Sequence, residues 1–284
     1  MRFAINVPNF GAFSDVRALA QLAHEAEEAG WDGFFLWDHI GSDWPTPVAD
    51  PWVALAAMAM TTQRITLAPV VTPLPRRRPW KLAREVVTLD HLSNGRVILG
   101  VGIGSDFGRE FSAYGEPADD KTHGAMLDEG LDVLLGLWSG ETFSYQGAHY
   151  TIHDARYTPT PLQEPRIPIW VAGVWPNKRP FQRAARWDGV VPLIRDEQRE
   201  ERPVMPDDVR VMLAYIHEQR TSAEPFDMVV AGFTGAMEPA AATALLDEYA
   251  AAGVTWWQEG FLPPDPIEAV HERIQAGPPR TSDR

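Results

Sequence analysis

The chain is constrained most by an alternation of short apolar runs and helix-patterned segments, which repeats eight times in 284 residues. Each apolar run is short enough to be a buried strand, and the segment after it has apolar residues at helical spacing. The expected strands are 3–7, 33–37, 65–70, 97–101, 168–173, 189–193, 227–231 and 254–257. The expected helices are 16–30, 51–62, 80–92, 125–138, 178–186, 207–220, 239–252 and 266–274. Eight such units predict a (β/α)8 barrel of the α/β class, with an open doubly wound sheet as the alternative.

One segment interrupts this alternation between the fourth helix and the fifth strand. Residues 142–165 are polar, aromatic and rich in proline, and they predict an irregular excursion with a hairpin around Gln146 and Gly147. No internal repeat or linker divides the chain, so we expect a single barrel domain over residues 1–276. Residues 277–284 are expected to form a disordered tail.

Composition and charge narrow the classes of partner. The chain has no cysteine, which excludes disulfides, thiolate metal ligands and cysteine nucleophiles. His149 and His153 lie on an expected strand, too far apart to share a zinc ion, so no metal site is expected. A net charge of −14 argues against nucleic acid as a partner. No apolar run is long enough to span a membrane and the first residues resemble a strand instead of a signal peptide, so we expect a cytoplasmic protein without a membrane partner.

Ligands of such barrels bind at the carboxyl ends of the strands, where this sequence has glycine-rich and polar segments. Gly100, Gly102 and Gly104 alternate along the fourth strand and its exit, so they point the same way and leave room for a flat or bulky group. The other candidates that follow expected strands are Asn6, Asn9, Asp38, His39, Val70–Thr72, Gly173–Arg179, Pro192, Gly232 and Glu259. These residues predict a small-molecule site at one rim of the barrel.

The longest pattern in the chain runs from Arg78 to Gly115. It comprises Arg78-Pro79, Leu82-Ala83-Arg84, Thr88-Leu89-Asp90, Leu92-Ser93-Asn94-Gly95-Arg96, Leu99-Gly100-Val101-Gly102, Gly104, Glu110-Phe111 and Gly115. Asp38-His39, Pro168-Ile169-Trp170 with Gly173, and Trp187-Asp188-Gly189 agree in order and spacing. Together they resemble the luciferase-like family of flavin-dependent oxidoreductases, which includes bacterial luciferase and F420-dependent reductases. The resemblance implies a (β/α)8 barrel that binds reduced FMN or the deazaflavin F420 and oxidises or reduces a second, often carbonyl-bearing or apolar, substrate.

The resemblance also implies a catalytic role for His39 beside the flavin ring, where an imidazole can donate or accept a proton. Asp38 is then the orienting partner of His39 or a helix cap. The alternative for His39 is a packed, hydrogen-bonded structural residue. Asn6, Trp37 and Trp44 are expected to line the substrate pocket near the flat ligand.

Three segments are expected to hold the coenzyme. By the resemblance, Pro69, Val70, Val71 and Thr72 lie under the ring with a cis peptide bond between Pro69 and Val70, ordinary trans backbone being the alternative. Gly102, Gly104 and Ser105 line the next wall through backbone contacts. The phosphate is expected at Gly173, Val174, Trp175, Asn177, Lys178 and Arg179, where amide donors, a helix dipole and two cations converge. Arg76–Arg78 are expected to be a surface or substrate-entrance loop.

The sequence favours FMN as the coenzyme, with F420 as the alternative. Relatives that use F420 often have a tryptophan soon after the Asp-His pair, as at Trp44. However, the sugar-phosphate dehydrogenases among them carry a glutamate where this chain has Ser105, and the acidic surface does not favour F420's polyglutamate tail. The expected function is oxidation or reduction of a small organic substrate by an enzyme of the luciferase-like monooxygenase type. F420-dependent hydride transfer is the alternative, followed by a metal-dependent barrel hydrolase and a non-catalytic flavin-binding protein.

Two kinds of protein partner stay open on this interpretation. A monooxygenase would need a separate flavin reductase, because the chain has no nicotinamide-binding fingerprint. The alanine-rich helix faces permit a homodimer without requiring one.

Overall fold

The computed structural model describes residues 1–41, 43–195 and 201–282. Parallel strand segments follow one another around a ring in the order β3-β2-β1-β12-β11-β9-β8-β5-β4. Segment β3 (Thr66–Pro69) lies within the third expected strand, 65–70, and β4 (Thr72–Pro73) continues it beyond the expected end, so the two segments are the halves of one barrel strand. A parallel bridge between Leu67 and Val97 joins the two ends of the ring. The predicted (β/α)8 barrel is therefore confirmed, and the open sheet is wrong.

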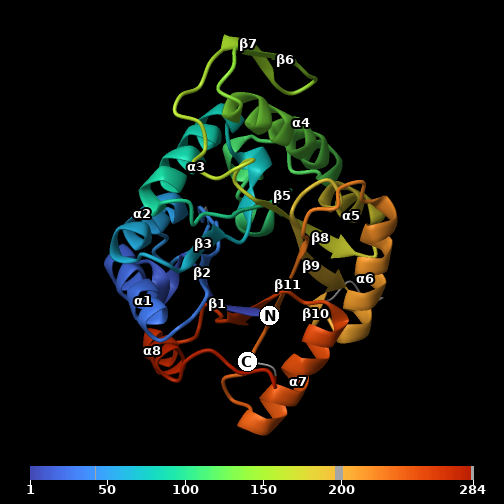
Figure 1. Cartoon of the computed structure of the whole chain (residues 1–284). Coiled ribbons are helices and arrows are strands. Elements are labelled where there is room, and N and C mark those ends of the chain that lie inside the picture. The colour runs from blue at the N-terminus through green and yellow to red at the C-terminus, as the bar shows by residue number, and fades with distance from the viewer. Residues whose placement is uncertain (42, 196–200, 283–284) are drawn as a thin grey trace.

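Helices surround this ring on all sides (Figure 1). The other barrel strands are β1 (Arg2–Val7), β2 (Gly33–Leu36), β5 (Leu99–Gly102), β8 (Ile169–Trp175), β9 (Gly189–Arg195), β11 (Asp227–Gly232) and β12 (Trp256–Gly260). The helices are α1 (Val16–Glu28), α2 (Pro51–Thr61), α3 (Pro79–Ser93), α4 (Asp120–Trp138), α5 (Lys178–Ala184), α6 (Pro206–Gln219), α7 (Pro239–Ala252) and α8 (Ile267–Gln275). Short 3₁₀ turns occur at Gly11–Phe13, Leu74–Arg76, Phe107–Arg109 and Ser112–Tyr114. None of the described helices is long and apolar enough to cross a bilayer.

Side chains fill the inside of the barrel below its mouth. Phe35, Trp170 and Trp256 are fully buried there, with ring centroids 5.4 to 5.7 Å apart. Smaller residues from neighbouring strands complete this cluster: Ala4, Ala68, Ile98 and Val229. Because the interior is packed, a ligand cannot enter the barrel itself, and ligands of such barrels bind at the carboxyl ends of the strands.

Local hydrogen bonds explain where two elements begin. Helix α4 starts at Asp120 instead of the expected residue 125, because the Asp119 carboxylate accepts a hydrogen bond from the Thr122 backbone N–H at 2.9 Å and caps the helix. Strand β12 starts two residues later than expected, because the Val254 N–H still bonds to the Tyr249 carbonyl at the end of α7. These local contacts move both boundaries without changing the element type.

The excursion forms the expected hairpin outside the barrel. Strands β6 (Phe143–Gln146) and β7 (Thr151–Ala155) pair antiparallel and lie at the outer edge next to α4 (Figure 1). The Glu129 carboxylate of α4 accepts hydrogen bonds from the backbone N–H groups of residues 148, 149 and 150 at 2.8 to 3.1 Å. This carboxylate fixes the turn of the hairpin to the barrel wall.

The segment after α8 lies against α7 as far as the structure describes it. Thr281 is buried, and the Ser282 hydroxyl and backbone N–H donate hydrogen bonds to the Asp247 carboxylate. The expected disordered tail is therefore not seen over residues 277–282, and the last two residues of that expectation lie outside the described part of the chain.

Candidate active site

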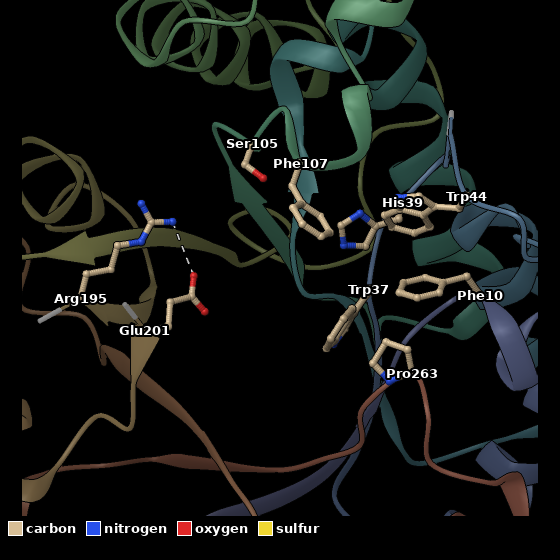
Figure 2. Close-up of a pocket in the computed structure, with 9 residues that line it drawn as sticks. All are labelled: Phe10, Trp37, His39, Trp44, Ser105, Phe107, Arg195, Glu201 and Pro263. Carbon is tan, nitrogen blue, oxygen red and sulfur yellow. Dashed lines mark ion pairs between the residues drawn. The ribbon is translucent and has the colours of Figure 1, made fainter. Parts of the chain in front are cut away.

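A pocket of about 520 Å³ opens at the barrel mouth. It is lined by Phe10, Trp37, His39, Trp44, Ser105, Phe107, Arg195, Glu201 and Pro263. Figure 2 shows the aromatic side chains grouped on one side around His39, with Arg195 and Glu201 on the opposite side. Arg195 ends β9, and Glu201 begins the short strand β10 (Glu201–Arg202), which pairs antiparallel with β9. Of the residues expected near a flat ligand, Trp37 and Trp44 line this pocket.

His39 lies in a collar of aromatic rings just after β2. Its ring centroid is 5.1 Å from Trp44, 5.6 Å from Phe10 and 5.9 Å from Trp37. Its side chain is 27% exposed, so it can still contact a molecule in the pocket. The Asn9 side chain fixes the backbone of this segment, because it accepts a hydrogen bond from the His39 N–H and donates to the His39 and Ala49 carbonyls.

Glu110, from the loop after β5, is the side-chain partner of His39. Its Oε2 lies 3.1 Å from His39 Nδ1, and its Oε1 accepts hydrogen bonds from the backbone N–H groups of Ile40 and Gly41 at 2.7 and 2.9 Å. Burial alone would raise the pKa of Glu110, but hydrogen bonds from His39 and Gly41 and the charge of Arg76 outweigh it and lower the pKa to about 2. Ionised Glu110 can only accept a hydrogen bond, so the proton of the neutral imidazole lies on Nδ1. His39 Nε2 is then the nitrogen that can accept a hydrogen bond from a bound molecule.

Asp38 does not orient His39, so that expectation is wrong. Its fully buried carboxylate instead takes hydrogen bonds from Arg76, Arg77 and the Thr72 hydroxyl at 2.7 to 2.9 Å. The two residues adjacent in sequence diverge because side chains alternate in direction along an extended strand end.

Arg76 and Arg77 also differ from the expected surface loop. Their side chains are 6% and 17% exposed, and Arg76 joins Asp38 to Glu110 through bonds of 2.7 Å. Two buried carboxylates need nearby cations, because an unpaired buried charge is strongly destabilising. The mouth is thus underlain by a charge-paired network, defined here as Asp38, Arg76, Arg77 and Glu110.

The third strand breaks between its two halves at a cis peptide bond. That bond joins Val70 to Val71, one residue later than expected, because the Val70 N–H still pairs with the Leu36 carbonyl at 2.8 Å and extends the ladder through Val70. Pro69 and Thr72 are buried on either side of the half-buried valines. None of these four residues is among the described residues that line the pocket, so their contact with a coenzyme ring stays a prediction.

The alternate glycines serve this break in the third strand. A Cβ on Gly100 would lie 2.2 Å from the Pro69 carbonyl oxygen, and one on Gly102 would lie 2.9 Å from Val71 Cγ2. The bulky group that needs the space is therefore the chain's own backbone and Val71. Gly104 has a φ of +72° and carries the chain past Phe111 to Ser105, which does line the pocket.

None of the residues of the expected phosphate segment, 173–179, is among the described residues that line the pocket. A Cβ on Gly173 would meet Pro180 at 2.7 Å, so this glycine permits close packing on α5. Lys178 Nζ lies 3.6 Å from the Trp175 ring centroid and 4.3 Å from that of Tyr215, so its charge is held by aromatic faces. Val174 is half-buried, while Asn177 and Arg179 are exposed at the start of α5. Phosphate binding by this segment stays a prediction.

Asn6 lies below the pocket and is buried. Its Nδ2 donates to Gln258 Oε1 at 2.6 Å, which joins β1 to β12 inside the barrel. Asn6 Oδ1 and Gln258 Nε2 are buried without a hydrogen-bond partner. Asn6 therefore belongs to the floor beneath the mouth, and the structure does not place it in the pocket lining.

The functional residues that sequence reasoning missed are Glu110, Phe10, Phe107 and the buried role of Arg76 and Arg77. Glu110 belongs to the pattern that carries the resemblance, but no role was expected for it, because its neighbours in sequence do not indicate that its carboxylate is only 2% exposed. Phe10 lies in the loop after the first strand. It could have been identified from the sequence only by treating every residue of the loops at the carboxyl ends of the strands as a candidate for the site.

Comparisons with known proteins agree with this architecture. The family model described as luciferase-like monooxygenase matches residues 1–277. An F420-dependent glucose-6-phosphate dehydrogenase of Nakamurella multipartita is 34% identical over 155 residues, which cover 51% of this chain and 44% of that protein. The chain spans about half the length of the curated relatives that it matches.

Solved structures show the same fold at low identity. An F420-dependent tetrahydromethanopterin reductase from Methanopyrus kandleri superposes with a TM-score of 0.76 at 18% identity, covering 97% of this chain and 98% of that chain. The monooxygenase RslO1 from Streptomyces bottropensis gives a TM-score of 0.74 at 18% identity, with coverages of 97% and 98%.

Proposed function

The chain belongs to the luciferase-like monooxygenase family, and we propose that it is an oxidoreductase that uses F420 to exchange a hydride with a small alcohol or carbonyl compound. The observation that carries this proposal is His39, held by ionised Glu110 inside an aromatic pocket. Similarity to F420-dependent relatives supports the choice of coenzyme. This choice reverses the order expected from the sequence, where FMN came first.

The residues at the mouth fit a flat three-ring coenzyme. Trp37, Trp44 and Phe10 offer planar apolar faces in the pocket lining, and the uncharged, half-buried Val70 and Val71 lie outside that lining at the break in the third strand. The pocket volume of about 520 Å³ lies in the ordinary range for small-molecule sites. These side chains would hold the ring, orient the substrate and exclude water.

In this proposal His39 is the general acid and base of the reaction. When bound, F420 supplies the centre that accepts or donates the hydride. During oxidation of an alcohol, His39 Nε2 accepts the hydroxyl proton, and during reduction it returns a proton to the carbonyl oxygen. Glu110 keeps Nδ1 protonated throughout, so that Nε2 faces the reacting oxygen in the correct tautomer.

Titration of the purified protein with F420 and with FMN, each oxidised and reduced, tests the proposal. We expect F420 absorbance and fluorescence to change with saturation, and reduced F420 to be consumed when a carbonyl compound is added without oxygen. No binding of either coenzyme would refute the proposal.

A second candidate is an FMN-dependent monooxygenase, which is favoured by the likeness to RslO1 over nearly the whole chain. On that alternative, reduced FMN binds in preference to F420, and turnover requires oxygen. The same titrations, repeated in air and under nitrogen, separate the two candidates.

A further inference from the structure

We propose that His123, in the first turn of α4, is a positioning residue that holds Glu110 against His39. It acts through the loop of residues 103–119, which follows β5 and carries Glu110. The inference rests on the proposed function, because that function makes the tautomer of His39 matter for catalysis. The contacts that carry it, however, lie outside the pocket lining and involve no coenzyme or substrate.

The loop that carries Glu110 has little buried surface of its own. Residues 112–119 are all exposed, whereas Glu110 and Phe111, which precede them, are only 2% and 1% exposed. Segments with few buried contacts open locally at a small cost in free energy. The position of Glu110 therefore depends on the contacts that hold the buried part of this loop.

His123 supplies two such contacts from α4, and it is itself buried. Its imidazole ring lies against the Phe111 ring, with centroids 4.1 Å apart and planes inclined at 35°. Its Nε2 lies 2.7 Å from the Pro117 carbonyl oxygen. A carbonyl oxygen can only accept a hydrogen bond, so Nε2 carries the proton and donates it. One side chain thus holds the loop at two points, one before and one after residues 112–116.

Phe111 links these contacts to the active site because it follows Glu110 directly in the chain. Its backbone N–H donates a hydrogen bond to the Asp106 carboxylate at 2.9 Å, and a Cβ on Gly104 would lie 3.0 Å from its ring. Both the backbone and the ring of Phe111 are therefore fixed, which limits the freedom of the residue before it. From this position the Glu110 carboxylate lies 3.1 Å from His39 Nδ1.

Histidine is the side chain that can make both contacts at position 123. Phenylalanine could pack on Phe111 but could not donate to Pro117, whereas glutamine could donate but has no ring. His123 Nδ1 is buried without a hydrogen-bond partner among the described residues, and burying such an atom is unfavourable. The two contacts with the loop offset this cost, which a residue that only fills space would not incur.

The tautomer of His39 tests the inference, because it can be measured without coenzyme or turnover. Long-range proton–nitrogen NMR spectra at about pH 8.5, where imidazoles are mostly neutral, show which ring nitrogen carries the proton. The signals of His39 are identified by their loss in His39→Gln. We expect His39 to carry its proton on Nδ1 in the wild type and to become a mixture of both tautomers in His123→Ala. The kcat of that variant should also fall about tenfold, because the base is misplaced.

Two conservative variants separate positioning from simple packing. His123→Phe keeps the ring contact and His123→Gln keeps the donor, so each should restore part of the wild-type tautomer signal. They also provide the measurement if His123→Ala does not fold. Folded variants, checked by circular dichroism, that all keep His39 protonated on Nδ1 would overturn the inference.

His91→Ala is the matched control, because His91 Nε2 likewise lies 2.8 Å from a loop carbonyl oxygen, that of Thr160. Thr160 belongs to the segment between β7 and β8, which does not carry Glu110. This variant should leave the His39 tautomer unchanged, and a shift equal to that of His123→Ala would count against a specific role for His123. A shift confined to the His123 variants, in a protein that binds neither F420 nor FMN, would support the positioning role while refuting the proposed function.

Discussion

The tautomer of His39 is set by the Oε2 atom of Glu110, 3.1 Å from Nδ1. Three further donors hold that carboxylate in place: two backbone N–H groups and Arg76. Because the Glu110 carboxylate is held by these hydrogen bonds, the His39 side chain bonded to it loses little conformational entropy when a substrate binds. The imidazole is therefore pre-organised to exchange a proton through Nε2.

Replacing His39 tests its role at the level of chemistry. We expect His39→Gln to lower kcat by about 10²–10⁴-fold, because the residue that moves the proton is lost. Coenzyme affinity should stay within about threefold, since the aromatic faces that hold the ring remain. Steady-state kinetics and coenzyme titration measure the two effects separately. Unchanged turnover would return His39 to the structural role considered from sequence.

Replacing Glu110 removes the anion that joins His39 to Arg76. Glu110→Gln keeps the shape but leaves Arg76 with one carboxylate, so we expect a loss of about 3–5 kcal/mol of stability and a lower kcat. Urea unfolding followed by circular dichroism measures the first effect.

The matched control for that change is Asp43→Asn, which removes the exposed pair with Arg109 from the same two loops. The side chains of this pair are 48% and 62% exposed, so its loss should change stability by less than about 1 kcal/mol. Equal effects of the two variants would show that burial of the charge-paired network has no energetic consequence.

At the scale of elements, the third and fourth barrel strands pack closely because glycines of the fourth leave space for the third. Gly100 and Gly102 have no side chains, so the backbone at the break between β3 and β4 and the Val71 side chain can approach them. The spacing of the glycines was visible in the sequence. Their occupant was not, because a glycine reports only that space is needed, and whether a ligand or the chain itself fills it is a tertiary fact.

Gly100→Ala tests this fit. The new Cβ would meet the Pro69 carbonyl oxygen at 2.2 Å, and backbone cannot move aside as a flexible side chain can. We expect a loss of about 1–3 kcal/mol of stability as the break between β3 and β4 shifts. Gly124→Ala in α4, where the nearest atom is Arg183 Nη2 at 3.5 Å, should instead be neutral or stabilising by up to about 1 kcal/mol. Thermal melts of both variants measure the contrast.

The sequence predicted the barrel well because its evidence is local. Periodicity, the Asp15 and Asp50 caps and the turn around Gly147 identify helices, strands and the hairpin. The site was predicted only in part. The charge-paired network joins Asp38 to Glu110 across 72 positions, and no local pattern distinguishes a buried carboxylate from a solvated one.

At the scale of the whole molecule, stability in acid depends on carboxylates that accept hydrogen bonds in the folded state. Backbone N–H donors outweigh burial and lower the pKa of Glu27 and Glu129 from 4.5, and the surroundings of Glu110 lower its pKa to about 2. The unfolded chain therefore binds more protons in acid than the native state. Stability from these groups is fully present above pH 4.5 and is lost as the pH falls toward 2.

Alkaline stability is limited by a buried phenol. Burial raises the pKa of Tyr150 from 10.0 to about 12, so its contribution is full below pH 10 and is lost as the pH rises through 12. The pH profile of stability should therefore fall on both sides of a plateau.

The net charge of −14 acts in the opposite direction on the acid side, because protonation relieves mutual repulsion. Repulsion between exposed charges is screened beyond about 8 Å at physiological ionic strength, whereas the bonded carboxylates are partly or wholly shielded from salt. We therefore expect the bonded carboxylates to dominate, so that Tm is nearly constant down to pH 5 and falls steeply below 4.5. Calorimetric scans from pH 7 to 3 in 0.15 M salt measure this profile, and the steepness should decrease in Glu129→Gln. A Tm that rises on acidification would mean that repulsion between the net negative charges, and not the hydrogen-bonded carboxylates of Glu27, Glu110 and Glu129, governs the stability of this barrel.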